Sequence, residues 1–295
     1  MEETLLLSYH SSALYTSDPL TLREGGWLSD AILGFYFEYL AHDVLAGSQT
    51  VLFLKPALVQ CLRVHTDAAS HSAAVPPDIF KRELVFIPVN GTAGNPAADA
   101  HWSLLVYVRR PKPAFHYFDS MANANYSHAL AVKEALVCLL KRFHRVPHTE
   151  DDPPLITHCC PQQENGSDCG IFVVLFADIL TRRYADAAWH TPQATATSGT
   201  VPTAQLLPSI PSPAPSIGSL TSNSPNNSDA FLHNTTTTHG STASLHRPPP
   251  AKRRINLEKT FWWIDYGDLR NPMQARLVLR SLVKKLCIKN NTPLI

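Results

Sequence analysis

Three short segments of the chain are mostly apolar and adjoin turn residues, and this pattern predicts three β-strands. The segments are residues 83–89, 101–108 and 115–120. A short proline-containing turn joins the second segment to the third, so these two are expected to pair as an antiparallel hairpin. This pairing would bring His101, at the start of one strand, near Asp119, at the end of the other. Alternation directs Trp102 to the face opposite His101.

Helices are predicted where apolar residues recur every three or four positions. Ser29 or Asp30 can cap the aromatic-rich helix that follows it. Ser127 can cap a second helix, and Asn271 with Pro272 can start a third. The apolar faces of these last two helices are Val132, Leu136, Leu139, Leu140 and Phe143, and Ala275, Leu279, Leu282, Val283 and Leu286. Both helices are therefore expected to pack one face against a core.

Composition divides the chain into parts. Residues 5–187 alternate apolar segments with short turns, as a packed α+β domain does. Ser, Thr, Pro, Ala and Asn dominate residues 190–250, which cannot bury enough apolar surface to offset the entropy of ordering. We therefore expect a main domain at 1–189, a disordered insertion at 190–255, and a helical segment at 256–295 that docks back on the main domain because it is too small to fold alone.

Charge and cysteine content exclude several classes of protein. The 295 residues carry a net charge of +1, which does not favour nucleic acid as a partner. No apolar run reaches membrane-spanning length, and the acidic N-terminus is unlike a signal peptide. Six cysteines without regular spacing favour a reduced protein in the cytoplasm or nucleus. We expect a monomer without a cofactor. A metal site is also not expected, since the adjacent Cys159 and Cys160 are poorly arranged to bind one metal ion together.

The segment Pro161–Gly170 contains the most informative chemistry. Cys169 directly precedes an apolar run at 171–177 that is typical of a buried helix. A thiol at a helix N-terminus faces the positive end of the helix dipole, which favours the thiolate. Gln163, upstream of Cys169, offers a neutral amide donor of the kind that stabilises an oxyanion.

Each of these residues has an ordinary structural explanation when taken alone. A lone cysteine is usually a small buried hydrophobe, and an aspartate near a turn usually caps that turn. The combination changes the interpretation, because His101, Asp119, Gln163 and Cys169 supply base, orienting group, oxyanion donor and nucleophile. The sequence therefore predicts a cysteine hydrolase.

Three motifs follow one another along the chain: His101-Trp102-Ser103-Leu104, Tyr117-Phe118-Asp119-Ser120 and Gln163-x-Asn165-x-x-Asp168-Cys169-Gly170. Together with Trp27-Leu28-Ser29-Asp30, they resemble the ubiquitin-like-specific protease family, also called the Ulp or sentrin-specific proteases, over residues 5–187. The resemblance implies a papain-like α+β fold with a central mixed sheet flanked by helices. It also implies cleavage after the C-terminal Gly-Gly of a ubiquitin-like modifier.

Within that family, Leu7-Ser8-Tyr9 and residues 101–107 resemble the deneddylases. The resemblance implies that Trp27 and Trp102 line a narrow tunnel that only glycines can pass, and that Asp30 contacts the modifier. Without it, both tryptophans would be interpreted as core aromatics. The implied partners are the neddylation modifier or SUMO and their conjugates, such as cullins.

Three alternatives remain open at this stage. A SUMO-directed protease would use the same chemistry with a different partner surface. A non-hydrolytic binding module would not need all four site residues, and acetyl transfer on a related scaffold would need a coenzyme A site. The basic cluster at 247–254 is consistent with nuclear import, and a solvated run of charge explains it equally well.

Overall fold

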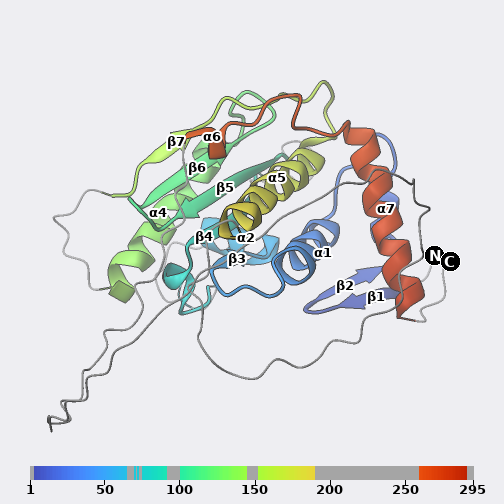
Figure 1. Ribbon diagram of the computed structural model, residues 1–295. Helices are drawn as coiled ribbons and strands as arrows, with labels where there is room; N and C mark the ends of the chain where they lie inside the picture. Colours follow the sequence, from blue (N-terminus) through green and yellow to red (C-terminus); the bar gives the residue numbers. More distant parts are fainter. Residues whose placement is uncertain are drawn as a thin grey trace, which may run out of the picture. The chain divides into compact units, whose positions relative to one another are not determined.

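A five-stranded mixed sheet forms the centre of the structure (Figure 1). The computed structural model describes residues 3–64, 70, 72, 75–91, 100–144, 152–189 and 259–290. These belong to one compact unit, residues 1–192 and 253–295. The strands, in their order across the sheet, are β3 (Val51–Phe53), β4 (Leu84–Asn90), β5 (Trp102–Val108), β6 (Ala114–Phe118) and β7 (Leu155–Thr157). β4, β5 and β6 pair antiparallel, whereas β3 and β7 add parallel strands at the edges.

Helices cover both faces of this sheet (Figure 1). The helices are α1 (Asp30–Tyr39) and α5 (Cys169–Trp189) on one face, and α2 (Pro56–Val64) and α4 (Tyr126–His144) on the other. Alternate residues of the strands point into the two cores: Leu104 and Val106 pack toward α5, while Leu105 and Tyr107 pack toward α4. The predicted α+β architecture, with a mixed sheet flanked by helices, is confirmed.

The N-terminal and C-terminal parts of the chain meet beside α5. β1 (Leu5–Tyr9) and β2 (Ser12–Tyr15) form a hairpin that precedes the 3₁₀ helix η1 (Asp18–Leu22). The last helix, α7 (Pro272–Lys289), packs against β1, η1 and α5. Shorter elements are the π-helical extension η2 (Leu40–Val44), the 3₁₀ helix η3 (Ile79–Lys81) and α6 (Lys259–Trp262).

The observed helix starts agree with the predicted ones in two cases and differ in one. Ser29 caps α1 by accepting a hydrogen bond from the Ile32 N–H at 3.3 Å. Asn271 caps α7, and its predicted apolar face is buried, with Leu282 partly so. The cap predicted at Ser127 is wrong, because α4 already begins at Tyr126 and the Asn125 carbonyl accepts from the Ala129 N–H.

The proposed insertion at 190–255 lies outside the described residues, but the elements on either side of it are in contact. Arg183 of α5 donates to the backbone carbonyls of Phe261 and Trp263 at 3.0 and 2.6 Å. It also forms an ion pair with Asp268 at 2.9 Å. The end of α5 and the start of α6 therefore lie close enough for a short link to join them.

Deleting residues 196–250 is expected to leave this unit folded, because 190–195 and 251–258 can span the remaining gap. The shorter loop costs less closure entropy, by about 1 kcal/mol, so Tm should stay level or rise by about 2–4 °C. Thermal unfolding followed by circular dichroism measures this. Deleting residues 259–290 is the control, and it should abolish cooperative unfolding. A large fall in Tm for the first variant would contradict a single-domain arrangement.

Candidate active site

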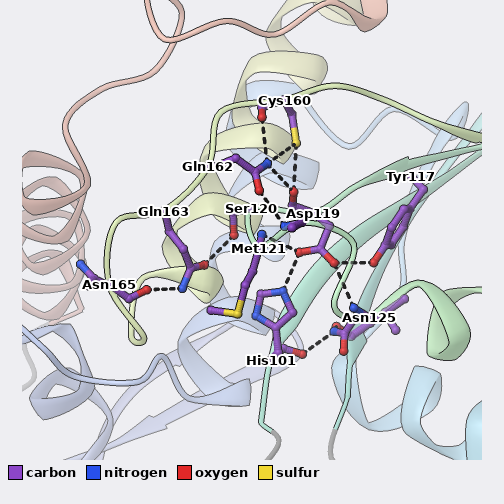
Figure 2. A network of polar contacts seen from close by, with 12 residues as sticks. His101, Tyr117, Asp119, Ser120, Met121, Asn125, Cys160, Gln162, Gln163 and Asn165 are labelled. Carbon is purple, nitrogen blue, oxygen red and sulfur yellow. Dashed lines mark hydrogen bonds and ion pairs between the residues drawn. The ribbon is translucent and has the colours of Figure 1, made fainter.

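His101 and Asp119 meet at one end of the β5–β6 hairpin, as predicted. His101 directly precedes β5 and Asp119 directly follows β6, and the antiparallel register pairs Leu104 with Phe118. The imidazole Nε2 donates to the Asp119 Oδ1 at 2.6 Å (Figure 2). Because Nε2 is used in this way, Nδ1 is the ring nitrogen left for another partner.

Asp119 is a buried carboxylate with several donors around it. Its Oδ1 also accepts from the Met121 N–H at 2.9 Å, while its Oδ2 accepts from the Tyr117 hydroxyl at 2.6 Å and the Asn125 N–H at 3.0 Å (Figure 2). Burial on its own would raise the pKa of Asp119, but hydrogen bonds from His101, Asn125 and Tyr117 lower it below its usual value. Asp119 therefore stays ionised and acts as a fixed acceptor.

His101 has a pKa raised to about 9. Burial opposes the charged imidazole, but the hydrogen bonds to Asp119 and Cys169 and the charges of both residues outweigh it. The backbone is held as well, since the Asn125 Nδ2 donates to the carbonyls of His101 and Val89 at 2.5 and 3.2 Å. Asp119 and Cys169 thus both raise the pKa of the same imidazole.

Cys169 is the first residue of α5 and is buried. The Asp168 carbonyl accepts the first hydrogen bond of the helix, from the Phe172 N–H at 2.9 Å. The N–H of Cys169, in the first turn, has no acceptor within the helix. The thiol and an available N–H therefore stand at one helix terminus.

Gln163 lies on the loop between β7 and α5 and is tied to the residue after Asp119. Its Oε1 accepts from the Ser120 hydroxyl at 2.7 Å, and its Nε2 donates to the Asn165 carbonyl at 2.5 Å (Figure 2). An amide nitrogen carries two hydrogens, so one is available beyond the bond to Asn165. Among the hydrogen bonds of the described residues, none joins Gln163 directly to His101 or Cys169.

The two tryptophans differ in exposure. Trp102 is 5% exposed, whereas Trp27 is 47% exposed. A Cβ added at Gly170 would lie 3.3 Å from the Trp102 Cδ1 and 2.6 Å from the Leu28 Cβ, so only glycine allows the start of α5 to pack this closely. Trp102 therefore forms a wall beside the cysteine, and Leu28 brings the Trp27 segment to the same place.

Asp30 is the first residue of α1 and is exposed, although neighbouring atoms shield part of its carboxylate from solvent. Burial raises its pKa, and a backbone hydrogen bond opposes this. No described contact ties it to His101 or Cys169, so any role in binding a partner remains a prediction.

Gln162 belongs to the site but was missed from the sequence. Its Nε2 donates to the carbonyls of Asp119 and Cys160, both at 2.9 Å, and its Oε1 accepts from the Ala122 N–H at 2.7 Å. Gln162 thus connects the loop before α5 with the turn after β6 (Figure 2). In the sequence, only its position next to Gln163 could have indicated that Gln162 belongs to the site, because a glutamine in a loop is not part of any motif by itself.

Within the described ranges, no group of three or more His, Cys, Asp or Glu side chains is arranged to hold a metal ion. No helix among the same residues has the length and apolar content needed to cross a bilayer.

The sequence profile of the Ulp1 protease family, C-terminal catalytic domain, matches residues 26–187. This match includes every side chain of the site described above. The chain belongs to the Ulp1 protease family. As a member, it is a cysteine-type protease that acts on ubiquitin-like modifiers, and its α+β fold is of the Ulp type.

Two curated relatives of this Ulp1-family chain share about a third of the aligned residues. Sentrin-specific protease 8 of Homo sapiens is 33% identical over 184 residues, covering 62% of this chain and 84% of the relative. NEDD8-specific protease 2 of Schizosaccharomyces pombe is 34% identical over 184 residues, covering 60% of this chain and 42% of the relative.

Solved structures of the same family are also similar. The C-terminal Ulp1 protease domain in complex with Smt3, the yeast ortholog of SUMO, aligns with a TM-score of 0.45 and 22% identity. The alignment covers 59% of this chain and 74% of that chain.

Replacing Asp119 with Asn is expected to lower the pKa of His101, because the carboxylate no longer counteracts the effect of burial on the charged imidazole. In the wild type, the raised pKa means that protonated His101 stabilises the fold below about pH 6.5, and this contribution is lost as the pH rises through about 9. Imidazole proton NMR titration measures both values. His116, whose pKa is lowered to about 3 by burial and by His158, serves as an unchanged reference. An unshifted His101 in the variant would contradict the assignment.

Proposed function

We propose that the chain is a deneddylase: it cleaves after the C-terminal Gly-Gly of NEDD8, both in precursors and in conjugates with target lysines. The observation that carries the proposal is the buried His101–Asp119 pair, whose imidazole is also influenced by Cys169 at the start of α5. Relatives named for NEDD8 and for sentrin-specific protease 8, at 33–34% identity, support the choice of modifier.

In the first step, His101 takes the proton of Cys169, and Asp119 holds the resulting imidazolium through Nε2. The thiolate attacks the carbonyl carbon of the last glycine, and the carbonyl oxygen becomes an oxyanion. The free Nε2 hydrogen of Gln163 and the N–H of Cys169 are the donors proposed to stabilise it. His101 then gives its proton to the leaving amine, which breaks the C–N bond and leaves a thioester.

In the second step, neutral His101 takes a proton from water, and the resulting hydroxide attacks the thioester. Collapse of this intermediate breaks the C–S bond and returns the proton from His101 to the Cys169 sulfur. The modifier leaves as a carboxylic acid, which loses its proton to solvent. A peptide amine and a lysine amine leave by the same route. The same residues therefore serve precursor processing and deconjugation.

Trp27, Trp102 and Asp30 are proposed to bind the modifier tail. Trp102 is a fixed wall beside Cys169, while the half-exposed Trp27 is free to close over a bound tail. Two aromatic walls favour a chain without side chains, which matches a Gly-Gly terminus. Asp30, at the exposed start of α1, is proposed to contact the body of the modifier.

The remaining expectations are part of the same proposal. NEDD8 conjugates such as cullins are the proposed substrates, and the enzyme is proposed to act as a monomer, without nucleic acid or a membrane as partner. All six cysteines are free thiols, which supports a reducing site of action in the cytoplasm or nucleus. The basic cluster at 247–254 lies outside the described residues.

A panel of modifiers with a C-terminal electrophile tests the proposed specificity. The NEDD8 probe should label Cys169, with a mass increase equal to the probe, and the SUMO probe should not. Cys169→Ala should abolish labelling and also cleavage of a NEDD8-fused reporter. Cys138→Ala, which removes an exposed thiol on α4, should keep both. Labelling by SUMO alone would overturn the choice of modifier, and cleavage by Cys169→Ala would overturn the nucleophile.

Replacing Trp27 with Ala is expected to reduce kcat/KM for a NEDD8 fusion by about 10–100-fold, since an aromatic anchor at an interface contributes about 1.4–3 kcal/mol. Tm should change little, because the side chain is half exposed. Trp263→Ala is the matched control, as Trp263 is 62% exposed and should leave kcat/KM unchanged. An unaltered kcat/KM in Trp27→Ala would remove Trp27 from the binding site.

A further inference from the structure

Arg276 of α7 is a cation buried in the protein, only 2% exposed. Its Nε and Nη2 both donate to the Asp168 Oδ1, at 3.1 and 2.6 Å, and Nη2 also donates to the Ser167 carbonyl at 3.3 Å. Asp168 immediately precedes Cys169. One side of the guanidinium therefore holds the residue directly before the proposed nucleophile.

The other side of the guanidinium holds the segment that leads to Trp27. Nη1 donates to the carbonyls of Thr21 and Arg23, both at 3.0 Å, and Nη2 donates to the Gly26 carbonyl at 2.8 Å. Gly26 immediately precedes Trp27. The planar, five-donor group of an arginine can satisfy all of these acceptors at once, which the single ammonium of lysine cannot do.

Hydrogen bonds in the turn before Cys169 connect Asp168 to Gln163. Asn165 Nδ2 donates to the other carboxylate oxygen of Asp168 at 2.8 Å, and Asn165 Oδ1 accepts from the N–H groups of Ser167 and Asp168. The Asn165 carbonyl in turn accepts from the Gln163 amide. Arg276 is therefore connected by consecutive hydrogen bonds to the proposed oxyanion donor.

A second contact from the same C-terminal segment reaches the start of this loop. The Tyr266 hydroxyl accepts from the Gln162 N–H at 3.0 Å, and Gln162 supports the Asp119 carbonyl. The segment at 259–290 thus contacts the active-site loop near both ends.

Stability alone does not explain why Arg276 is buried here, because replacing a buried ion pair with apolar residues often causes no loss of stability. What distinguishes Arg276 is the identity of its partners. They lie next to Trp27 on one side and next to Cys169 on the other, two residues that the proposed function places on the same substrate tail.

We propose that Arg276 is a positioning residue, which fixes the Trp27 segment and the Cys169 helix start relative to each other so that the modifier tail is aligned with the nucleophile. This inference rests on the proposed function, in which Cys169 attacks and Trp27 covers the tail. The helix that follows the proposed insertion thereby completes the active site.

The first test compares Arg276→Lys with Arg280→Lys in the full chain. Arg280 is exposed on the same helix and should keep wild-type kcat and KM. Arg276→Lys keeps the charge but loses the planar fork, so kcat/KM for a NEDD8 fusion should fall about 10–100-fold, with both a lower kcat and a higher KM. A kcat/KM for Arg276→Lys within twofold of the wild type would overturn the proposal.

The second test removes both charges of the Arg276–Asp168 ion pair together. Asp168→Asn combined with Arg276→Met leaves no unpaired buried ion, so the double variant should keep cooperative unfolding while kcat/KM stays low. Asp168→Asn alone releases only the Cys169 side, because Arg276 still has its carbonyl partners, and should lower kcat with KM within about twofold.

The outcomes separate this inference from the proposed function. A wild type that does not cleave the NEDD8 fusion means that the proposed function has failed. An active wild type with an equally active double variant means that Arg276 has no positioning role. If neither Arg276→Lys nor the double variant folds, Arg276 is needed for stability and the proposal is also wrong.

Discussion

A buried carboxylate must be fully hydrogen-bonded, and the arrangement of this site depends on how Asp119 meets that need. Its donors come from β6, from the turn after it, from the start of α4 and from His101. An unpaired charge there would cost several kcal/mol. One residue, Asp119, therefore holds together the hairpin, the first turn of α4 and the imidazole. Moving His101 away would leave the buried carboxylate without one of its donors, which is energetically unfavourable.

A second buried carboxylate, Asp168, applies the same constraint on the other side of the cysteine. It lies in the turn that ends at α5 and is satisfied by Arg276 and Asn165. The segments that position His101 and Cys169 thus belong to different hydrogen-bond networks. The loop that contains Gln162 and Gln163 joins these networks, because it bonds to Asp119 and Ser120 at one end and to Asn165 at the other.

The parts of the site that depend on local patterns could be predicted from the sequence. The antiparallel pairing of β5 and β6 across a short turn placed His101 beside Asp119, and a cap such as Ser29 depends only on neighbouring residues. Arg276 could not be found in this way, because its bond to Asp168 joins residues 108 positions apart, and an arginine within an amphipathic helix normally faces solvent. The prediction of a cap at Ser127 was wrong because α4 begins at Tyr126, directly after Asn125. The Asn125 side chain also donates to the His101 carbonyl.

In the proposed mechanism, the raised pKa of His101 helps one imidazole to serve two opposite steps. At about 9, it approaches the basicity of a leaving lysine amine, so the proton can be transferred without a large uphill step. The second step needs a neutral base instead. Cys169 is one of the groups that raise this pKa, and its thiolate charge moves to the oxyanion on attack and is absent from the thioester. Acylation itself therefore lowers the pKa of His101 and prepares it to deprotonate water, while Asp119 keeps the ring in place throughout.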